Sequence, residues 1–409
     1  MTSKIADPSL VSRGRLAHEW AKARMSILDR IVRSHSAKPL SGLRLGICLH
    51  VTRETSVLAM AAKDLGAQVS LCSANPLSAQ DDIAAFLDAE GIGVYAWRAE
   101  TEQEYRDCIR TVAESRPHLV IDDGGDLHSA IHGAKKSSKL PIGGTEETTS
   151  GVKRLKALEA EDRLLYPVIA VNNAKTKFLF DNQHGTGQST IDGVLRSTGM
   201  LVAGKTVVVC GYGWVGRGVA SRARGMGARV VVTEVDPVKA LEAHMDGYDV
   251  RRMSEATLMG DLIITCTGQK GVIRAEYFKN MKDGAILANA GHFNVEIDVG
   301  YLKANGRRTL LRPNLEQYVV SGRKLYLLSE GRVVNLVAAE GNPPEVMALS
   351  FANQLLCILY SADKAQSLEK KVYGVPDEID RKVAAYALED RRLQIDSLTP
   401  EQEKYSRSS

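Results

Sequence analysis

The stretch GYGWVGRG at residues 211–218 decides the fold of this chain of 409 residues. It follows the apolar run KTVVVC, opens a helix-like segment, and precedes a second apolar strand, ARVVVTE, which ends at Glu234. In this order Gly211 allows a tight turn, Gly213 lets the backbone approach a pyrophosphate, and Gly216 lets the helix pack on the strand. An acidic residue about 20 positions downstream accepts both hydroxyls of an adenosine ribose and repels a 2′-phosphate. We therefore predict a dinucleotide-binding unit with NAD, rather than NADP, as cofactor.

Composition and charge place the chain among ordinary globular proteins. Hydrophobic residues make up 44% and charged residues 25%, and acidic and basic side chains are interspersed to give a net charge of +4. Because no block of like charge is long enough to follow a phosphate backbone, we expect no nucleic acid partner. The six cysteines stand singly, so we expect reduced thiols, no metal site and a cytoplasmic protein. The N-terminus lacks a signal-peptide core and no apolar run approaches about 18 residues, so we expect no membrane segment.

Strand-like and helix-like segments alternate along most of the chain. LRLGICLH, AQVSLCSAN, IGVYAWR and HLVIDDGGD have the character of strands, and segments with helical periodicity separate them. The alternation resumes in a second unit that contains the glycine motif, DLIITCTG and AILANAGHF. This pattern predicts an α/β protein built on parallel sheets.

Polar and ionisable side chains gather where several predicted strands end, which is where an open α/β sheet places its binding crevice. These residues are His50, Thr52, Glu54 and Thr55; Asp122 and Asp123; Glu147, Thr148, Thr149 and Ser150; and Lys177, Asp181 and Asn182. Chance placement of polar residues on the surface does not readily explain several such segments, so we expect them to converge on one crevice.

Some of these residues also have a purely structural interpretation. The sequence around Asp122 and Asp123, DDGG, makes a good turn, although paired carboxylates also share a proton and act as bases. Lys177 is equally well explained as a solvated helix charge, but an apolar stretch and a nearby aspartate allow a tuned pKa. A single histidine such as His50 is more often a core residue whose ring nitrogens have hydrogen-bond partners than a catalytic residue. His292 follows an apolar strand at a glycine turn, where we expect it to face the nicotinamide end of the crevice.

Taken together, these segments resemble the S-adenosylhomocysteine hydrolase (adenosylhomocysteinase) family. The resemblance covers nearly the whole chain and rests on CLHVTRET, SANPLSAQDD, VYAWRAET, IDDGGDL, TEETTSGV, VNNAKTKFLFDN, GTGQSTIDG, AGKTVVVCGYGWVGRG, TEVDPVKALEA, NAGHFNVEID and EGRVVNL. GTGQS and the short tail are similar to the short-tailed branch of the family. Longer members place a C-terminal Lys and Tyr in a neighbouring subunit's cofactor site, a contact that we do not expect from the ending EQEKYSRSS.

The resemblance implies hydrolysis of S-adenosylhomocysteine to adenosine and homocysteine through transient oxidation. In this family the ribose 3′-hydroxyl is oxidised to a ketone by NAD, which acidifies the C4′ proton. A base removes that proton and homocysteine leaves from C5′. Water then adds and the ketone is reduced, so NAD is regenerated in each turnover.

The resemblance also implies a role for each matching residue. The catalytic set is His50, Asp122, Asp123, Lys177, Asp181 and His292. Within it, Lys177 and Asp181, with Asn182, would handle the 3′-hydroxyl proton, and the other four would transfer protons at C4′ and C5′. The substrate-binding set is Thr52, Glu54, Thr55, Glu147, Asn182 and Asn342. The residues expected to hold NAD are Thr148, Thr149, Ser150, Gly211, Gly213, Trp214, Val215, Gly216, Glu234, Thr267, Asn289 and Asn335.

The rim of the implied pocket departs from the family pattern, most clearly at Asn342, where the family has the histidine of a Gly-His-Pro segment. The other departures are Ala79, Gln183, His184 and Asn294. Because the oxidation and elimination residues are retained, the departures bear on the substrate more than on the chemistry. They leave open a lyase or dehydratase of specialised metabolism, which would apply 3′-oxidation and elimination to a different adenine nucleoside. A regulatory NAD-binding protein is disfavoured, because NAD binding alone does not require the catalytic set.

The resemblance further implies the domain organisation. A substrate-binding domain would comprise residues 1–183 and 345–390, a Rossmann NAD-binding domain would be inserted at 184–344, and 391–409 would form a C-terminal tail. We expect a hinge that closes the two domains over the ligand. We also expect a homotetramer or homodimer that acts on a small adenine nucleoside.

Overall fold

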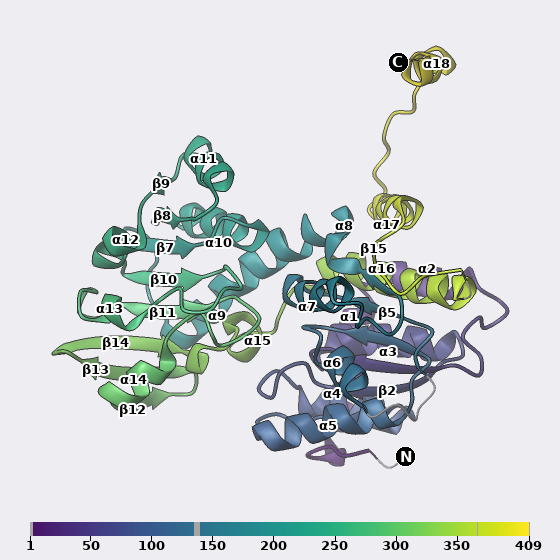
Figure 1. Cartoon of the computed structure of the whole chain (residues 1–409), viewed down its shortest axis with the longest axis horizontal. Helices are drawn as coiled ribbons and strands as arrows, with labels where there is room; N and C mark the ends of the chain where they lie inside the picture. The colour runs from purple at the N-terminus through teal and green to yellow at the C-terminus, as the bar shows by residue number, and fades with distance from the viewer. Residues whose placement is uncertain (1–2, 135–139, 366, 409) are drawn as a thin grey trace.

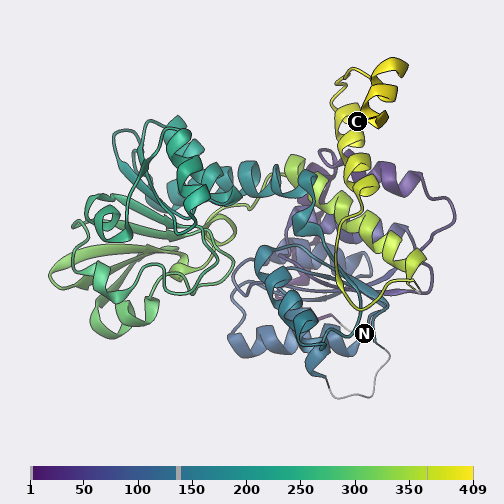
Figure 2. The same cartoon turned by 45° about the horizontal axis from the view of Figure 1, so that its top comes forward.

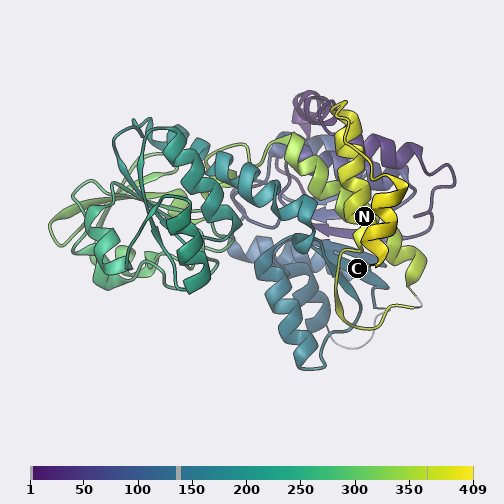
Figure 3. The ribbon, with the colours of Figure 1, turned by 90° about the horizontal axis from the view of Figure 1, so that it is seen from above.

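Two α/β units, each built on its own sheet, lie side by side and are joined by two crossings of the chain (Figure 1). The computed structural model describes residues 3–134, 140–365 and 367–408. Seen from above, the units form separate lobes with helices between them (Figure 3). This arrangement confirms the predicted α/β class with a Rossmann-like unit and a second α/β unit.

The first unit is a seven-stranded sheet in the order β15-β6-β5-β4-β1-β2-β3, and every neighbouring pair is parallel. Its strands are β1 (Arg44–Cys48), β2 (Gln68–Cys72), β3 (Gly93–Tyr95), β4 (Leu119–Asp122), β5 (Gly143–Glu146), β6 (Val168–Ala170) and β15 (Val372–Gly374). Its helices are η1 (Pro8–Leu10), α1 (Val11–Lys22), α2 (Ser26–Arg33), α3 (Arg53–Asp64), α4 (Asp81–Ala89), α5 (Glu102–Glu114), α6 (Asp126–Gly133), α7 (Thr149–Ala160), η2 (Val171–Asn173), α8 (Lys175–Phe178), α16 (Pro344–Lys364) and α17 (Asp377–Asp390).

The second unit is an eight-stranded sheet in the order β12-β13-β14-β11-β10-β7-β8-β9. Its strands are β7 (Thr206–Cys210), β8 (Arg229–Thr233), β9 (Asp249–Val250), β10 (Leu262–Thr265), β11 (Ile286–Asn289), β12 (Arg307–Arg312), β13 (Leu315–Val320) and β14 (Arg323–Leu328). Its helices are α9 (Gly187–Thr198), α10 (Trp214–Gly225), α11 (Pro237–Met245), α12 (Met253–Met259), α13 (Ala275–Phe278), α14 (Val299–Asn305), η4 (Ser329–Gly331) and α15 (Val334–Val337). The sheet is parallel except at one edge, where β12, β13 and β14 run antiparallel.

Helices cover both faces of the sheets, and each face has its own apolar core. In the first unit one cluster packs under α1–α4, α16 and α17, and a second lies under α5–α7. The second sheet likewise has a core on each side. Strands buried on both faces read as continuous apolar runs, which is why VVVC of β7 and LIIT of β10 were recognisable in the sequence.

Helix α16 returns the chain to the first unit and lies in its core. Its length and composition would suffice to cross a membrane, but 67% of its most apolar window is buried inside the protein. It packs against α2, α17 and β5. Its apolar character is therefore that of a core helix.

The chain ends in a helix that stands away from the body. Helix α18 (Pro400–Ser408) contains no buried residue, and it projects beyond α17 in two views (Figures 1 and 2). The six cysteines are all free, and five of them are buried.

Candidate active site

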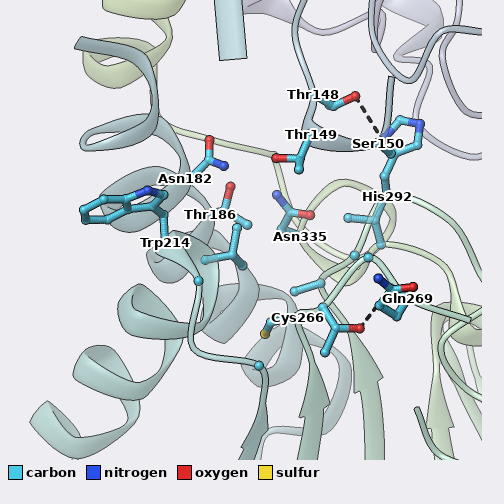
Figure 4. Close-up of a pocket in the computed structure, with 18 of the residues that line it drawn as sticks. Thr148, Thr149, Ser150, Asn182, Thr186, Trp214, Cys266, Gln269, His292 and Asn335 are labelled. Atoms are coloured by element: carbon cyan, nitrogen blue, oxygen red, sulfur yellow. Dashed lines mark hydrogen bonds between the residues drawn. The ribbon is translucent and has the colours of Figure 1, made fainter. Parts of the chain in front are cut away.

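A cavity of about 1240 Å³ lies between the two units. Its wall is formed by residues that follow the carboxyl ends of strands in both sheets, from His50 after β1 to His292 after β11. This is the place where open parallel sheets bind ligands. Figure 4 shows side chains of both units around the cavity, with Asn182 and Trp214 on one side and Ser150 and His292 on the other.

Lys177 is the centre of a buried ionic cluster in this cavity. Its Nζ lies 2.7 Å from Asp181 Oδ2, 2.9 Å from Asn182 Oδ1 and 3.5 Å from Glu147 Oε1. Burial opposes the charge of the amine, but the two carboxylates raise the pKa of Lys177 above its usual value. The side chain is therefore an ammonium. We call Lys177, Asp181, Asn182 and Glu147 the lysine cluster.

Glu147 is held in this cluster from the buried face of α16. Gln354 Nε2 donates to Glu147 Oε2 at 2.5 Å, and the Ser350 hydroxyl donates to Oε1. Burial raises the pKa of Glu147 to about 7, although Lys177 acts in the opposite direction. A carboxyl with this pKa can gain or lose a proton near neutral pH.

A second group, the histidine cluster, consists of His50, Asp123 and His292. His50 Nε2 lies 3.4 Å from Asp123 Oδ2, and His292 Nδ1 lies 3.5 Å from Asp123 Oδ1. His50 Nδ1 also contacts the Ser78 hydroxyl at 2.7 Å. Burial lowers the pKa of His50 to about 4, so this imidazole is neutral at pH 7. Because His292 belongs to the second unit, the cluster spans the cleft.

Two groups of side chains have ligand atoms close enough together to hold a metal ion. They are the histidine cluster and the group Asp122, His128 and Glu146, each with ligand atoms within 4.8 Å of one another. The expectation that the protein uses no metal therefore stays a prediction.

The cofactor side of the cavity follows from the glycine motif. Gly211 has φ +98°, and a Cβ on Gly216 would lie 2.0 Å from the Gly211 carbonyl oxygen, so the motif needs glycine for the turn and for helix packing. Gly213 caps α10 with open space beside it. The carboxylate of Glu234 accepts from Tyr212 N–H at 2.6 Å and Val235 N–H at 2.7 Å. A free helix N-terminus and a carboxylate at the end of the next strand fit a dinucleotide.

Most of the predicted site residues line this one cavity. On its wall are His50, Thr52, Glu54, Thr55, Asp123, Glu147, Thr148, Thr149, Ser150, Lys177, Asp181, Asn182, Gly211, Gly213, Trp214, Val215, Glu234, Thr267, His292, Asn335 and Asn342. Thr52 and Thr148 are in addition helix N-caps, of α3 and α7. The ring of Trp214 stacks on Phe178 across the two units at 4.9 Å.

Asp122, Gly216 and Asn289 lie behind the wall. Asp122 is fully buried and accepts from the backbone N–H groups of Asp123 and His128. Asn289 donates to the carbonyl oxygens of Gly291, Phe293 and Gly331. Asp122 and Asn289 therefore do not line the cavity, whereas the sequence grouped them with residues that touch substrate or cofactor. Both shape the turns that carry their neighbours.

The structure connects Asn342 to the lysine cluster. Its Oδ1 accepts from Ser189 Oγ at 2.7 Å and from Asn335 Nδ2 at 3.2 Å. Its Nδ2 donates to Thr186 Oγ1 at 3.1 Å and also to Asp181. Both polar atoms of Asn342 therefore have protein partners.

Sequence reasoning missed the residues that hold Glu147. Ser350 and Gln354 lie on one face of an otherwise apolar helix, together with Asn353. Polar residues at spacings of three and four within an apolar helix were the signal that was available.

The fold and the cavity define an NAD-binding α/β enzyme with two buried ionisable clusters in one cleft. A family model described as "S-adenosyl-L-homocysteine hydrolase, NAD binding domain" matches residues 182–341, and one described as "S-adenosyl-L-homocysteine hydrolase" matches residues 2–142. The chain is 55% identical to an adenosylhomocysteinase of Sulfurisphaera tokodaii over 99% of this chain and 98% of the relative. It is 56% identical to an adenosylhomocysteinase of Aeropyrum pernix, over 98% of each. It is also 48% identical to an S-inosyl-L-homocysteine hydrolase of Methanopyrus kandleri, over 99% of this chain and 96% of the relative.

The chain belongs to the S-adenosyl-L-homocysteine hydrolase family. It is therefore a hydrolase with NAD as cofactor, and its family acts on a small nucleoside thioether. The resemblance seen in the sequence is confirmed.

Proposed function

We propose that this chain hydrolyses S-adenosyl-L-homocysteine to adenosine and homocysteine. The observation that carries the proposal is the meeting of the lysine and histidine clusters in one cavity, opposite the dinucleotide motif. The lysine cluster is suited to transfer the proton of a ribose hydroxyl, and the histidine cluster is suited to transfer a proton from carbon. Neither cluster is needed to bind NAD alone.

The cofactor would be held by residues of both units. The α10 N-terminus at Gly213 suits the pyrophosphate and Glu234 suits the adenosine ribose, while Thr148 and Thr149 line the cavity from the first unit. Bound NAD supplies reversible oxidation at the ribose 3′ carbon.

The lysine cluster would move the 3′-hydroxyl proton. Lys177 is charged, so it can accept that proton only while it releases one of its own. Glu147 lies 3.5 Å away, and its pKa of about 7 makes it a matched acceptor near neutral pH. We infer a concerted relay in which the hydroxyl proton passes to Lys177 as an ammonium proton passes to Glu147. Asp181 keeps the ammonium in place.

The histidine cluster would move the proton at C4′. Neutral His50 and Asp123 are both acceptors, and they lie 3.4 Å apart. The group that takes the C4′ proton can return it to the departing sulfur at C5′. His292 reaches the same carboxylate from the second unit, which would complete the cluster around the ribose.

The first test is thiol release from S-adenosyl-L-homocysteine with chromatography of the nucleoside product. Wild-type protein should release homocysteine and adenosine in equal amounts. Lys177→Met should retain NAD but lose at least about 100-fold in rate, as expected for loss of a proton-transfer group. The control is Lys175→Met, an exposed lysine on the same short helix, which should behave like wild type. An unchanged rate in Lys177→Met would contradict the relay.

The same chromatogram separates the alternative end points. An unsaturated nucleoside in place of adenosine would favour the lyase or dehydratase, in which hydration does not follow elimination. Absence of thiol release, with NAD reduced by another adenine nucleoside, would move the proposal to a different substrate.

A second candidate substrate is S-inosyl-L-homocysteine, the substrate named for the relative of Methanopyrus kandleri. The residue that bears on this choice is Glu54, a buried carboxyl of the cavity wall that Arg53 Nε contacts at 2.8 Å. Its ionised form accepts from the N1–H of a 6-oxopurine or from the N6 amino group of adenine, whereas its protonated form, which burial favours by raising the pKa of Glu54, donates to the N1 of adenine. Competing hydrolysis of the two thioethers decides between them, and Glu54→Gln should shift the ratio toward the adenosyl compound.

We also propose the domain division at residues 1–183, 184–344 and 345–390. The return of β15 to a place beside β6 supports it. The predicted homotetramer or homodimer is tested by light scattering during size-exclusion chromatography.

A further inference from the structure

Glu296 is a buried carboxylate behind the part of the cavity wall that follows β10. Its side chain is 0% exposed. Oε2 accepts from Thr267 N–H at 3.0 Å and from Thr267 Oγ1 at 2.6 Å, and Oε1 accepts from Gly268 N–H at 2.8 Å. Both carboxylate oxygens therefore hold the loop that begins at Cys266, and Thr267 and Gly268 of that loop line the cavity.

The same carboxylate touches a second loop. A Cβ on Gly291 would lie 1.8 Å from Glu296 Oε1, so the backbone of Gly291 packs directly on this oxygen. Gly291 and His292 line the cavity, and Asn289 also holds the turn that contains them. Glu296 thus lies between the loop after β10 and the turn that carries His292.

The backbone around Glu296 is fixed as well. Gly271 N–H donates to Val295 O at 2.8 Å, and Ile273 N–H donates to Glu296 O at 2.9 Å. The side chain therefore has little freedom to follow a loop that moves. Because a carboxylate only accepts hydrogen bonds, three donors from Thr267 and Gly268 suit it, whereas an amide would turn an N–H group toward one of them.

We propose that Glu296 is a positioning residue that sets both loops at once. It keeps Thr267 and Gly268 in the wall that faces NAD, and it supports the turn that brings His292 to Asp123. It touches neither substrate nor cofactor. The retention of NAD and the placement of His292 depend on the same buried carboxyl group, whichever nucleoside thioether the enzyme hydrolyses.

The test compares Glu296→Gln with a matched control, Glu316→Gln. Glu316 is a carboxylate of β13 in the second sheet, 1% exposed, and its partners are Arg308 and Tyr318, none of which lines the cavity. In the NAD-loaded protein, Glu296→Gln should release NAD at least about tenfold faster, as expected from the loss of a hydrogen bond to a charged group. It should also lower kcat by a similar factor while KM changes less than about twofold, because His292 acts on the bound substrate.

A purely structural role for Glu296 gives a different pattern. Both variants would then lower the melting temperature and leave the rate of NAD release at 25 °C unchanged. That result, in folded Glu296→Gln protein with wild-type kcat, would overturn the proposal. If Glu296→Gln does not fold, Gly291→Ala replaces it, because its methyl group would push the His292 turn away from Oε1. Gly291→Ala should lower kcat, and wild-type kcat in that variant would count equally against the proposal.

Discussion

At the scale of single residues, Asn342 shows how a departure from the family pattern is built into the site. Its amide joins Asp181 and Thr186 on one side to Ser189 and Asn335 on the other. This arrangement needs a side chain that donates and accepts at the same time. An amide provides both functions without a charge, so the negative charge of Asp181 stays paired with Lys177.

Replacing Asn342 by Asp should therefore disturb the lysine cluster. The new carboxylate would face Asp181, and repulsion of like charges would displace that side chain from Lys177. We expect kcat to fall at least about tenfold with NAD content unchanged. Asn294→Asp makes the same chemical change at an exposed position and should have no effect. Equal kcat values in the two variants would show that Asn342 does not act through Asp181.

Glu147 should determine the acid limb of the profile of kcat against pH. Burial raises the pKa of Glu147 to about 7, and only the ionised form accepts a proton. We therefore expect kcat to rise with pH and to level off above about 7. The Ser350 hydroxyl stabilises the ionised form, so Ser350→Ala should raise this pKa further and move the limb to higher pH. A limb that moves to lower pH, or does not move, in Ser350→Ala would exclude Glu147 as its source.

Most of the residues that the sequence grouped together line one cavity, but the sequence did not show which members of each group face it. Asp122 and Asp123 are adjacent, and successive residues at a strand end point to opposite sides, so only one of them reaches the cavity. The role of Glu296 was not predicted, because its partners are the Thr267 hydroxyl and backbone N–H groups of a loop whose path the sequence does not reveal.

At the scale of elements, close glycine packing joins α10, which begins in the glycine motif, to the segment that carries Asp181. The chain crosses between the units in the π-helical turn η3 (Asp181–Thr186), which carries Asp181 and Asn182. A Cβ on Gly218 of α10 would lie 1.9 Å from the Gln183 carbonyl oxygen of this turn. Helix α10 and the turn can therefore approach only through glycine.

Gly218→Ala should separate these two elements. We expect a loss of about 1–3 kcal/mol in the free energy of unfolding, as for other overpacked sites, together with weaker NAD binding. The matched control is Gly225→Ala at the end of the same helix, where a Cβ would meet nothing within 4 Å. That change should be neutral or stabilising, because alanine favours the helix. Urea unfolding of both variants measures the difference, and equal stability would contradict the packing argument.

Elements that are buried on both faces were predictable, and exposed ones were not. The strands β7, β8 and β10 are continuous apolar runs. In contrast, all six residues of β12, RRTLLR, are exposed, so this edge strand lacks the alternation that marks a half-buried strand. The π-helical turn was not predicted either, since such turns are rare and this one covers only six residues.

At the scale of the whole molecule, exposed polar contacts join the two units in addition to the packing around their shared cavity. Arg98 Nη2 donates to Val337 O at 2.9 Å, and Arg332 pairs with Glu102 at 2.8 Å across the cleft. The Glu102 side chain is 62% exposed, and ion pairs of this kind contribute about 1 kcal/mol or less. Loss of these contacts should have little effect on the relative position of the two units.

Bound NAD should do more to couple the units than these contacts. Each unit has its own apolar cores, so cofactor-free protein should unfold in two calorimetric transitions. The cavity is lined by Thr148 and Thr149 from the first unit and by Gly213 and Glu234 from the second, so we expect NAD to bind the folded form of both. At 100 times its Kd, a ligand adds about 2.7 kcal/mol to the form that it binds. We expect NAD to raise the temperatures of both transitions and to reduce the difference between them. If NAD raised only the transition of the second unit, Thr148 and Thr149 would not contact the cofactor, and the first unit would hold substrate alone.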